Sequence, residues 1–159
     1  MNEITIKGEL INTKSYNHRR TLGNYGEMLL QLFFIKHNII FKNMNDINEF
    51  SRYDFNISIK DKTYIIELKT RIGNIENHSI EIIDYNKVNH YLKENYNIIF
   101  VFNHIETEDI HNFFYYEIDD FERFKEITFL NTNYKNYYYE LNVKYLKKLE
   151  DLFKLKENL

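Results

Sequence analysis

Two strand-like segments joined by a short charged turn constrain this chain more than any other feature of its sequence. Residues 52–59 (RYDFNISI) alternate strictly between polar and apolar side chains. A period of two is typical of a β-strand with one buried face. Residues 63–70 (TYIIELKT) form a second such segment, and residues 60–62 between them suit a turn. The pattern therefore predicts an antiparallel β-hairpin.

The predicted hairpin brings three charged side chains to one face. Glu67 and Lys69 are two residues apart, so they project from the same side of their strand. Residues opposite each other in a hairpin also share a side. If the turn holds an even number of residues, Asp54 lies on the same face as Glu67 and Lys69. This holds whether Asp54 lies opposite Glu67 or opposite Lys69. A slip of one residue would move Asp54 to the opposite face.

Two carboxylates and a lysine on one face suit the hydrolysis of a phosphodiester bond. Neighbouring carboxylates repel unless a proton or a cation lies between them, and oxygen ligands of this kind favour a hard cation such as Mg²⁺. A nearby lysine could orient a water molecule or stabilise charge on the phosphate. The alternative is that Glu67 and Lys69 simply form ion pairs with Asp54, because an acid-x-lysine triplet is common by chance.

The other patterns predict a mixed α/β chain. Residues 22–37 show helical recurrence, with Glu27 in the first turn, where the helix dipole favours a carboxylate. The further expected elements are a strand at 39–41, a loop at 42–50, a strand at 79–83, a helix at 85–94 capped by Asp84, strands at 97–102, 113–118 and 137–143, and a helix at 144–157. A core of helix, three strands, helix and strand indicates one mixed sheet flanked by helices.

Length and composition bound the class of protein. With 159 residues we expect a single domain, with a core at about 20–102 and a C-terminal extension at 103–159. The absence of cysteine excludes a disulfide framework, a zinc ribbon and a cysteine nucleophile, and it suits the cytoplasm. The longest apolar runs are far shorter than the about 20 residues that span a bilayer, so we expect no membrane partner.

The charge is acidic overall and unevenly distributed. A net charge of −3, from 21 basic and 24 acidic side chains, does not suit a protein that binds nucleic acid through charge alone. Residues 104–126 hold eight acidic and two basic side chains, a local charge of −6, so the remainder carries +3. We interpret the acidic stretch as a solvated edge that leaves the basic residues on another face.

These elements and residues resemble the PD-(D/E)xK nuclease superfamily, which includes many restriction endonucleases and archaeal-type Holliday junction resolvases. The matching residues are Glu27 in GNYGE, Asp54 in SRYDF, and Glu67-Leu68-Lys69 in IIELKTR. The resemblance covers residues 20–102 and implies the restriction endonuclease-like αβββαβ core of that family. Tyr53 stands where the family pattern has proline, which is not a metal ligand.

The resemblance implies a metal-dependent DNA endonuclease and a role for each matching residue. Asp54, Glu67 and the Leu68 carbonyl would bind Mg²⁺ or Mn²⁺, and Lys69 would act on the attacking water. Glu27 would complete the site through a metal-bound water or a second ion. The products would carry a 5′-phosphate and a 3′-hydroxyl. For Glu27 the alternative is an ordinary acidic residue near the start of a helix.

Four basic residues are candidates for DNA binding. Arg71 shares the predicted face of Glu67 and Lys69 and could contact a phosphate. Arg19 and Arg20 form a small basic cluster just before the first predicted helix. Lys87 lies on the polar side of the second helix, where some members of the family place a further catalytic residue. Each of them could equally be a solvated charge.

We therefore expect a nuclease that cuts branched or duplex DNA. The small size, and a GNYGE helix start soon after a basic segment, favour a structure-selective, resolvase-like enzyme. Such an enzyme would act as a homodimer in the cytoplasm of a bacterium, or of the host cell if the chain is viral. The alternatives are a restriction, repair or degradative nuclease of the same superfamily, and a non-catalytic nucleic-acid-binding or assembly module. The acidic composition suits that module, whereas the clustered carboxylates argue against it.

Overall fold

The computed structural model describes residues 2–47, 53–118, 127–131 and 137–157, so the predicted strand position of Arg52 lies outside it. In chain order the elements are β1 (Glu3–Ile6), β2 (Glu9–Asn12), α1 (Tyr16–Lys36), β3 (Ile40–Asn43), α2 (Met44–Ile47), β4 (Phe55–Ile59), β5 (Lys62–Ile72), η1 (Ile75–Asn77), β6 (Ile80–Asp84), α3 (Tyr85–Lys93), β7 (Ile98–Thr107), β8 (Ile110–Ile118), β9 (Ile127–Asn131), β10 (Tyr137–Asn142), η3 (Val143–Tyr145), β11 (Lys147–Lys148) and α4 (Leu149–Glu157).

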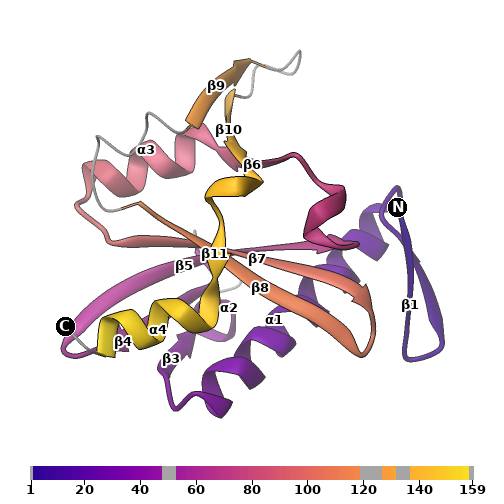
Figure 1. Cartoon of the computed structure of the whole chain (residues 1–159), viewed down its shortest axis with the longest axis horizontal. Helices are drawn as coiled ribbons and strands as arrows, with labels where there is room; N and C mark the ends of the chain where they lie inside the picture. The colour runs from indigo at the N-terminus through magenta and orange to yellow at the C-terminus, as the bar shows by residue number, and fades with distance from the viewer. Residues whose placement is uncertain (1, 48–52, 119–126, 132–136, 158–159) are drawn as a thin grey trace.

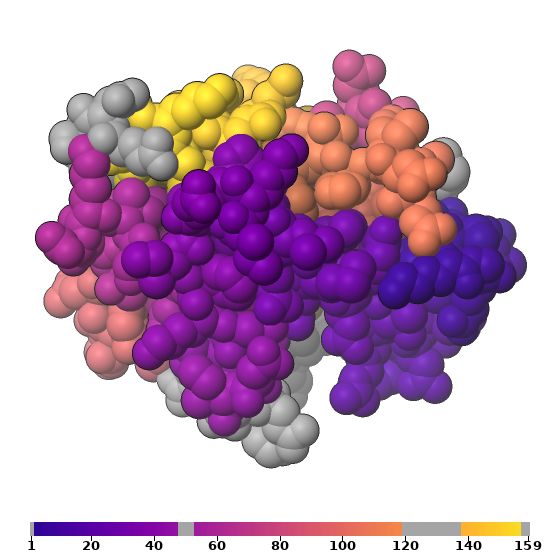
Figure 2. Space-filling model, turned by 90° about the horizontal axis from the view of Figure 1, so that it is seen from below, coloured from indigo at the N-terminus to yellow at the C-terminus, as the bar shows by residue number. Residues whose placement is uncertain are grey.

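A six-stranded mixed sheet forms the centre of the fold (Figure 1). Its strand order is β11-β8-β7-β5-β4-β3, with β5 and β7 parallel and the other neighbours antiparallel. Helices α1 and α4 cover one face, and α3 covers the other (Figure 1). In Figure 2 the chain from α1 to α2 (purple) lies between the N-terminal hairpin (indigo) and α4 (yellow). The predicted mixed α/β class is confirmed.

Each face of the sheet has its own apolar core. Leu30 and Phe34 of α1 pack with Leu152 of α4 against one face of the sheet. Val88 and Tyr91 of α3 belong to the core on the other face. None of the helices in the described ranges has both the length and the apolar character to cross a membrane.

The predicted hairpin forms, with one of the two expected registers. Phe55 lies opposite Ile66, and the series continues to Ile59 opposite Lys62. The loop is Lys60-Asp61, and both residues have positive φ, of 47° and 66°. Two positive-φ residues are typical of a type I′ turn, whose twist suits a two-residue hairpin. The turn thus holds an even number of residues. This is the condition under which Asp54 shares a face with Glu67 and Lys69.

The first helix begins earlier than predicted, at Tyr16 instead of residue 22. Ser15 is extended and no residue of 16–22 interrupts the helix. Arg19 and Arg20 therefore lie inside α1, and the prediction that they precede it is wrong. Glu27 lies in the middle of α1, so the helix dipole does not explain it. Contact with the sheet explains its place, because Gly26 beside it packs directly on Thr70 of β5.

The strands of the predicted core share one sheet, as expected, but two other expected strands lie outside it. The strands expected at 79–83 and 137–143 form β6 and β10, which pair with β9 in a separate three-stranded sheet. The turn after β5 leads the chain away from the central sheet, since Gly73 has a φ of 100° and Asn74 caps η1. Strands β1 and β2 form a further hairpin that was not predicted. The expected loop at 42–50 contains α2, and the last helix begins at Leu149 rather than 144.

Candidate active site

The candidate site lies where β4 leaves the edge of β5. Strand β4 pairs with β5 only as far as Ile66, while β5 continues to Ile72. Asp54, just before β4, occupies the open edge, and its Oδ2 accepts a hydrogen bond from the Leu68 N–H at 2.8 Å. In a strand the N–H and C=O of one residue face the same neighbour. The Leu68 carbonyl therefore also faces the edge that Asp54 occupies.

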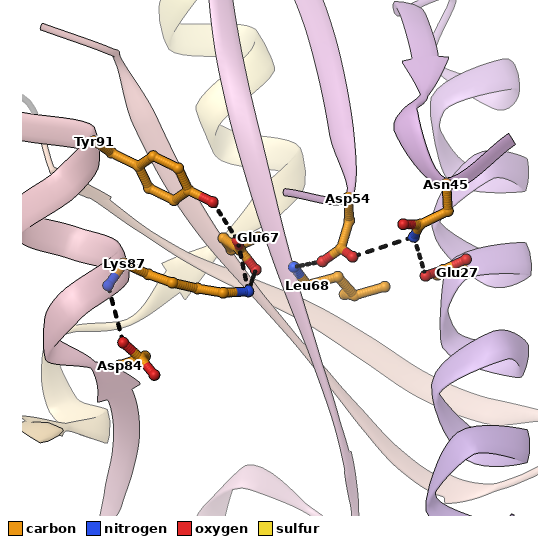
Figure 3. A network of polar contacts seen from close by, with 8 residues as sticks. All are labelled: Glu27, Asn45, Asp54, Glu67, Leu68, Asp84, Lys87 and Tyr91. Carbon is orange, nitrogen blue, oxygen red and sulfur yellow. Dashed lines mark hydrogen bonds and ion pairs between the residues drawn. The ribbon is translucent and has the colours of Figure 1, made fainter. Parts of the chain in front are cut away.

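Glu27 reaches the same edge from α1. The side-chain amide of Asn45, on α2, lies between Glu27 and Asp54 (Figure 3). Its Nδ2 is 2.8 Å from Glu27 Oε1 and 3.4 Å from Asp54 Oδ1. The structure thus brings Glu27 and Asp54 to one amide group, although they come from different elements.

Glu67 faces the α3 side of the sheet and is only 2% exposed. Lys87 Nζ lies 3.1 and 3.3 Å from its two carboxylate oxygens. The Tyr91 hydroxyl donates to Glu67 Oε1 at 3.0 Å (Figure 3). Lys87 and Tyr91 are four residues apart on α3, so the spacing of the helix aims both at the same carboxylate.

Lys69 lines a cleft of about 430 Å³ between α1 and the end of β5. Glu27, Arg19 and Arg71 line the same cleft. Lys69 forms no ion pair with any residue in the described part of the chain. Its positive charge acts on Glu67, which lies two residues before it on the strand. The cleft therefore combines a carboxylate with several cations.

Burial and a neighbouring negative charge raise the pKa values of two of the carboxyl groups, those of Glu67 and Glu27. Burial and the negative charge of Asp54 raise the pKa of Glu67 above its ordinary value, although Lys87 and Lys69 oppose this. Burial and Asp54 likewise raise the pKa of Glu27, against the hydrogen bond from Asn45. Neighbouring ionised carboxylates destabilise one another, so the cluster favours uptake of a proton or binding of a cation.

The DNA-binding candidates occupy different environments. Arg19 donates through Nη1 to the carbonyls of Thr13 and Lys14, at 2.9 and 3.2 Å, and lines the cleft. Arg20 is exposed on the same helix and does not line the cleft. Lys87 is engaged with Glu67. Of the residues 19, 20 and 87, only Arg19 therefore adjoins the cleft.

Arg71 is held by a buried acid that the sequence did not reveal. Its Nε lies 3.0 Å from Glu81 Oε2, and His104 Nε2 lies 3.0 Å from Glu81 Oε1. Burial opposes ionisation of Glu81, but His104 and Arg71 outweigh it and lower the pKa of this carboxyl. The guanidinium of Arg71 is therefore fixed beside the cleft.

We expect Glu81→Gln to lower the free energy of unfolding at pH 7 by about 1–2 kcal/mol, through loss of charge-assisted contacts. A lowered folded-state pKa contributes stability fully above the ordinary value of 4.5, and this is lost as pH falls through the folded-state pKa. The difference from the wild type should thus shrink at acid pH. Urea unfolding at pH 7 and pH 3 measures it, with exposed Glu76→Gln as control. An equal difference at both pH values would contradict the assignment.

The donor set fits a hard divalent cation. Three carboxylates and the Leu68 carbonyl supply oxygen ligands of the kind that Mg²⁺ and Mn²⁺ prefer. As they stand, no three His, Asp or Glu side chains within the described ranges are grouped as a complete metal site. Lys87 and Asn45 contact carboxylate oxygens that a cation would use. Binding would therefore require these side chains to move.

Sequence patterns missed two of the site's polar partners. Asn45 falls in a polar segment that was predicted to be a loop, and no spacing rule connects it to Asp54. Tyr91 lies on the buried face of its helix and is 1% exposed, a place where an aromatic side chain suits the core. Its position four residues after Lys87 was the available signal for a shared target.

Comparisons with known proteins support the architecture. The chain matches no protein-family model, and no curated protein matches its sequence. Among solved structures, a nuclease from a fusselovirus superposes with a TM-score of 0.53 at 18% identity, over 91% of this chain and 94% of that chain. The chain shares its fold with this viral protein. The likeness extends well beyond residues 20–102, the part that carried the resemblance in sequence.

Proposed function

We propose that this chain is a metal-dependent nuclease of the PD-(D/E)xK type that hydrolyses phosphodiester bonds in DNA. The observation that carries the proposal is the arrangement of Asp54, Glu67 and Lys69 around the open edge of β5, beside a cleft lined with cations. The fold of a viral nuclease supports it. Glu27 and Glu67 have raised pKa values, and Lys69 forms no ion pair within the described ranges. Such a combination is more typical of a catalytic site than of a structural ion pair.

Each residue has a distinct part in the proposed reaction. Asp54, Glu67 and the Leu68 carbonyl would hold Mg²⁺ or Mn²⁺, and Glu27 would complete the site from α1. The bound cation supplies Lewis acidity toward the phosphate and lowers the pKa of water. Lys69 orients the attacking water and stabilises negative charge that develops on the phosphate. Lys87 and Tyr91 hold the Glu67 carboxylate in one orientation through the contacts described above.

The cleft is the proposed path of the substrate strand. Arg19 and Arg71 lie along it with Lys69. Contacts to phosphates position a nucleic acid without reading its sequence. Because Glu81 fixes Arg71 and two carbonyls fix Arg19, both guanidinium groups are already oriented before a phosphate arrives. Arg20 would contact DNA outside the cleft.

The first test is cleavage of plasmid and linear DNA by the purified protein. We expect cutting with Mg²⁺ or Mn²⁺, none with excess EDTA, and 5′-phosphate ends on the products. Restoring the cation after EDTA should restore the activity. Tight DNA binding without cleavage under any of these conditions would instead favour the non-catalytic binding module.

We further propose that the enzyme prefers branched DNA and works as a homodimer, since two strands need two sites. A four-way junction and a linear duplex with the same arms, in competition, test the preference. We expect the junction to be cut at least about tenfold faster, which is a difference of about 1.4 kcal/mol in activation free energy. Equal rates would remove the structure-selective proposal, and a monomeric mass in sedimentation would remove the homodimer.

A further inference from the structure

Asn45 lies between two carboxylates that repel each other. Its amide nitrogen carries two hydrogens, and it contacts Glu27 Oε1 at 2.8 Å and Asp54 Oδ1 at 3.4 Å (Figure 3). Each carboxyl oxygen it contacts is one that the proposed cation would need. The amide group therefore takes the place between the carboxylates that a cation would take.

The local backbone holds Asn45 in this place. The N–H of Met44 donates to the Asp54 carbonyl at 2.8 Å, so α2 is fastened to the residue before β4. The N–H of Asn45 itself donates to the Asn43 side chain at 3.0 Å. These two hydrogen bonds fix the backbone on the N-terminal side of the Cα of Asn45. The amide is thus brought to the carboxylates by ordered structure and not by chance rotation of a long side chain.

We propose that Asn45 is a positioning residue that competes with the divalent cation for Asp54 and Glu27. This inference rests on the proposed nuclease function. The amide keeps the two carboxylates oriented before the cation binds, and it must release at least one of them when the cation arrives. Asn45 therefore sets the cation concentration at which the site fills.

The direction in which Asn45 changes the affinity for the cation follows from thermodynamic linkage between its hydrogen bonds and cation binding. Hydrogen bonds from Asn45 stabilise the protein before cation binding, because a hydrogen bond to a charged group is stronger than a neutral one. The same bonds are weakened or lost once the cation holds those oxygens. Removing the amide should therefore destabilise only the cation-free protein, and the protein should bind the cation more tightly. A residue that merely supported the site would have the opposite effect.

The test is calorimetric titration of the full chain with Mn²⁺ after removal of metals. We expect Asn45→Ala to lower the Kd for Mn²⁺ by about five- to tenfold, and the isosteric Asn45→Asp to lower it further. The rise in Tm on adding Mn²⁺ should be larger for both variants than for the wild type. An unchanged or raised Kd in Asn45→Ala would overturn the proposal, even if Asn45→Asp bound more tightly.

Two controls separate this proposal from the proposed function. Asn74 donates to Glu106 at 2.7 Å outside the site, so Asn74→Ala removes a comparable amide–carboxylate bond and should leave the Kd for Mn²⁺ unchanged. If the wild type binds Mn²⁺ and Asp54→Asn abolishes binding, while Asn45→Ala does not tighten it, only the role of Asn45 fails. If the wild type does not bind Mn²⁺ at all, both proposals fail.

Discussion

Replacing Lys69 by methionine should reduce DNA cleavage by about 10³-fold, the loss typical when a charge that stabilises a transition state is removed. Methionine keeps most of the volume of the side chain and removes only the ammonium group. Because Lys69 forms no ion pair with any other residue in the described ranges, its removal should change Tm by no more than a few degrees. Single-turnover cleavage rates measure the effect.

Asp54→Asn should have an effect of similar size for a different reason. Asparagine can still accept the hydrogen bond from the Leu68 N–H, so the edge of β5 should keep its structure. The substitution removes one negative charge from the proposed cation site, so Mn²⁺ binding should be lost together with cleavage. Lys62 lies at the start of β5, the strand that also carries Lys69. Lys62→Met is therefore the matched control for Lys69→Met, and this variant should cut DNA like the wild type. Cleavage that survives both Lys69→Met and Asp54→Asn would refute the site.

Gly26→Ala should lower the free energy of unfolding by about 2 kcal/mol, although alanine is normally the better helix former. A Cβ atom at Gly26 would lie 1.9 Å from Thr70 Oγ1 and 3.0 Å from Thr70 Cβ. Helix α1 would have to move away from β5, and Glu27 would move with it. Chemical denaturation measures the stability, and cleavage of DNA should fall as well.

The same helix offers a matched control. A Cβ atom at Gly23 meets nothing within 4 Å, so Gly23→Ala should stabilise the chain by about 0.5–1 kcal/mol. Combining Gly26→Ala with Thr70→Ala should recover much of the loss, because the hydroxyl and the methyl group in the way are removed. If Gly26→Ala and Gly23→Ala change the free energy of unfolding equally, the contact with Thr70 is not the reason why glycine is needed at residue 26.

Local sequence patterns predicted those elements whose structure is determined mainly by residues close together in the chain. The hairpin followed from strict alternation, and a parity argument limited its register to two possibilities, one of which forms. Asp84 does cap α3 through the N–H of Lys87. Strand β7 followed from an unbroken apolar run, as buried parallel strands usually do. In each case the signal lay within one element or two neighbouring elements of the chain.

What could not be predicted depended on contacts between distant segments. The start of α1 carries polar and basic residues that are mostly exposed, so no local apolar period reveals that the helix begins at Tyr16. Strand β6 was expected from the sequence, yet it pairs with β10, more than 50 residues later, and not with the central sheet. Asn45 meets Glu27 and Asp54 only after three elements have come together. The charged residues of the hairpin were visible in the sequence, whereas the partners that orient them were not.

The two-residue loop at Lys60-Asp61 carries a consequence for how such a chain can change through evolution. Surface loops usually accept insertions and deletions readily. Here, one added or deleted residue that shifted the pairing by one position would turn Asp54 to the other side of β4 and away from Glu67. Although this turn lies outside the site, its length should therefore be conserved as strictly as the acidic residues themselves.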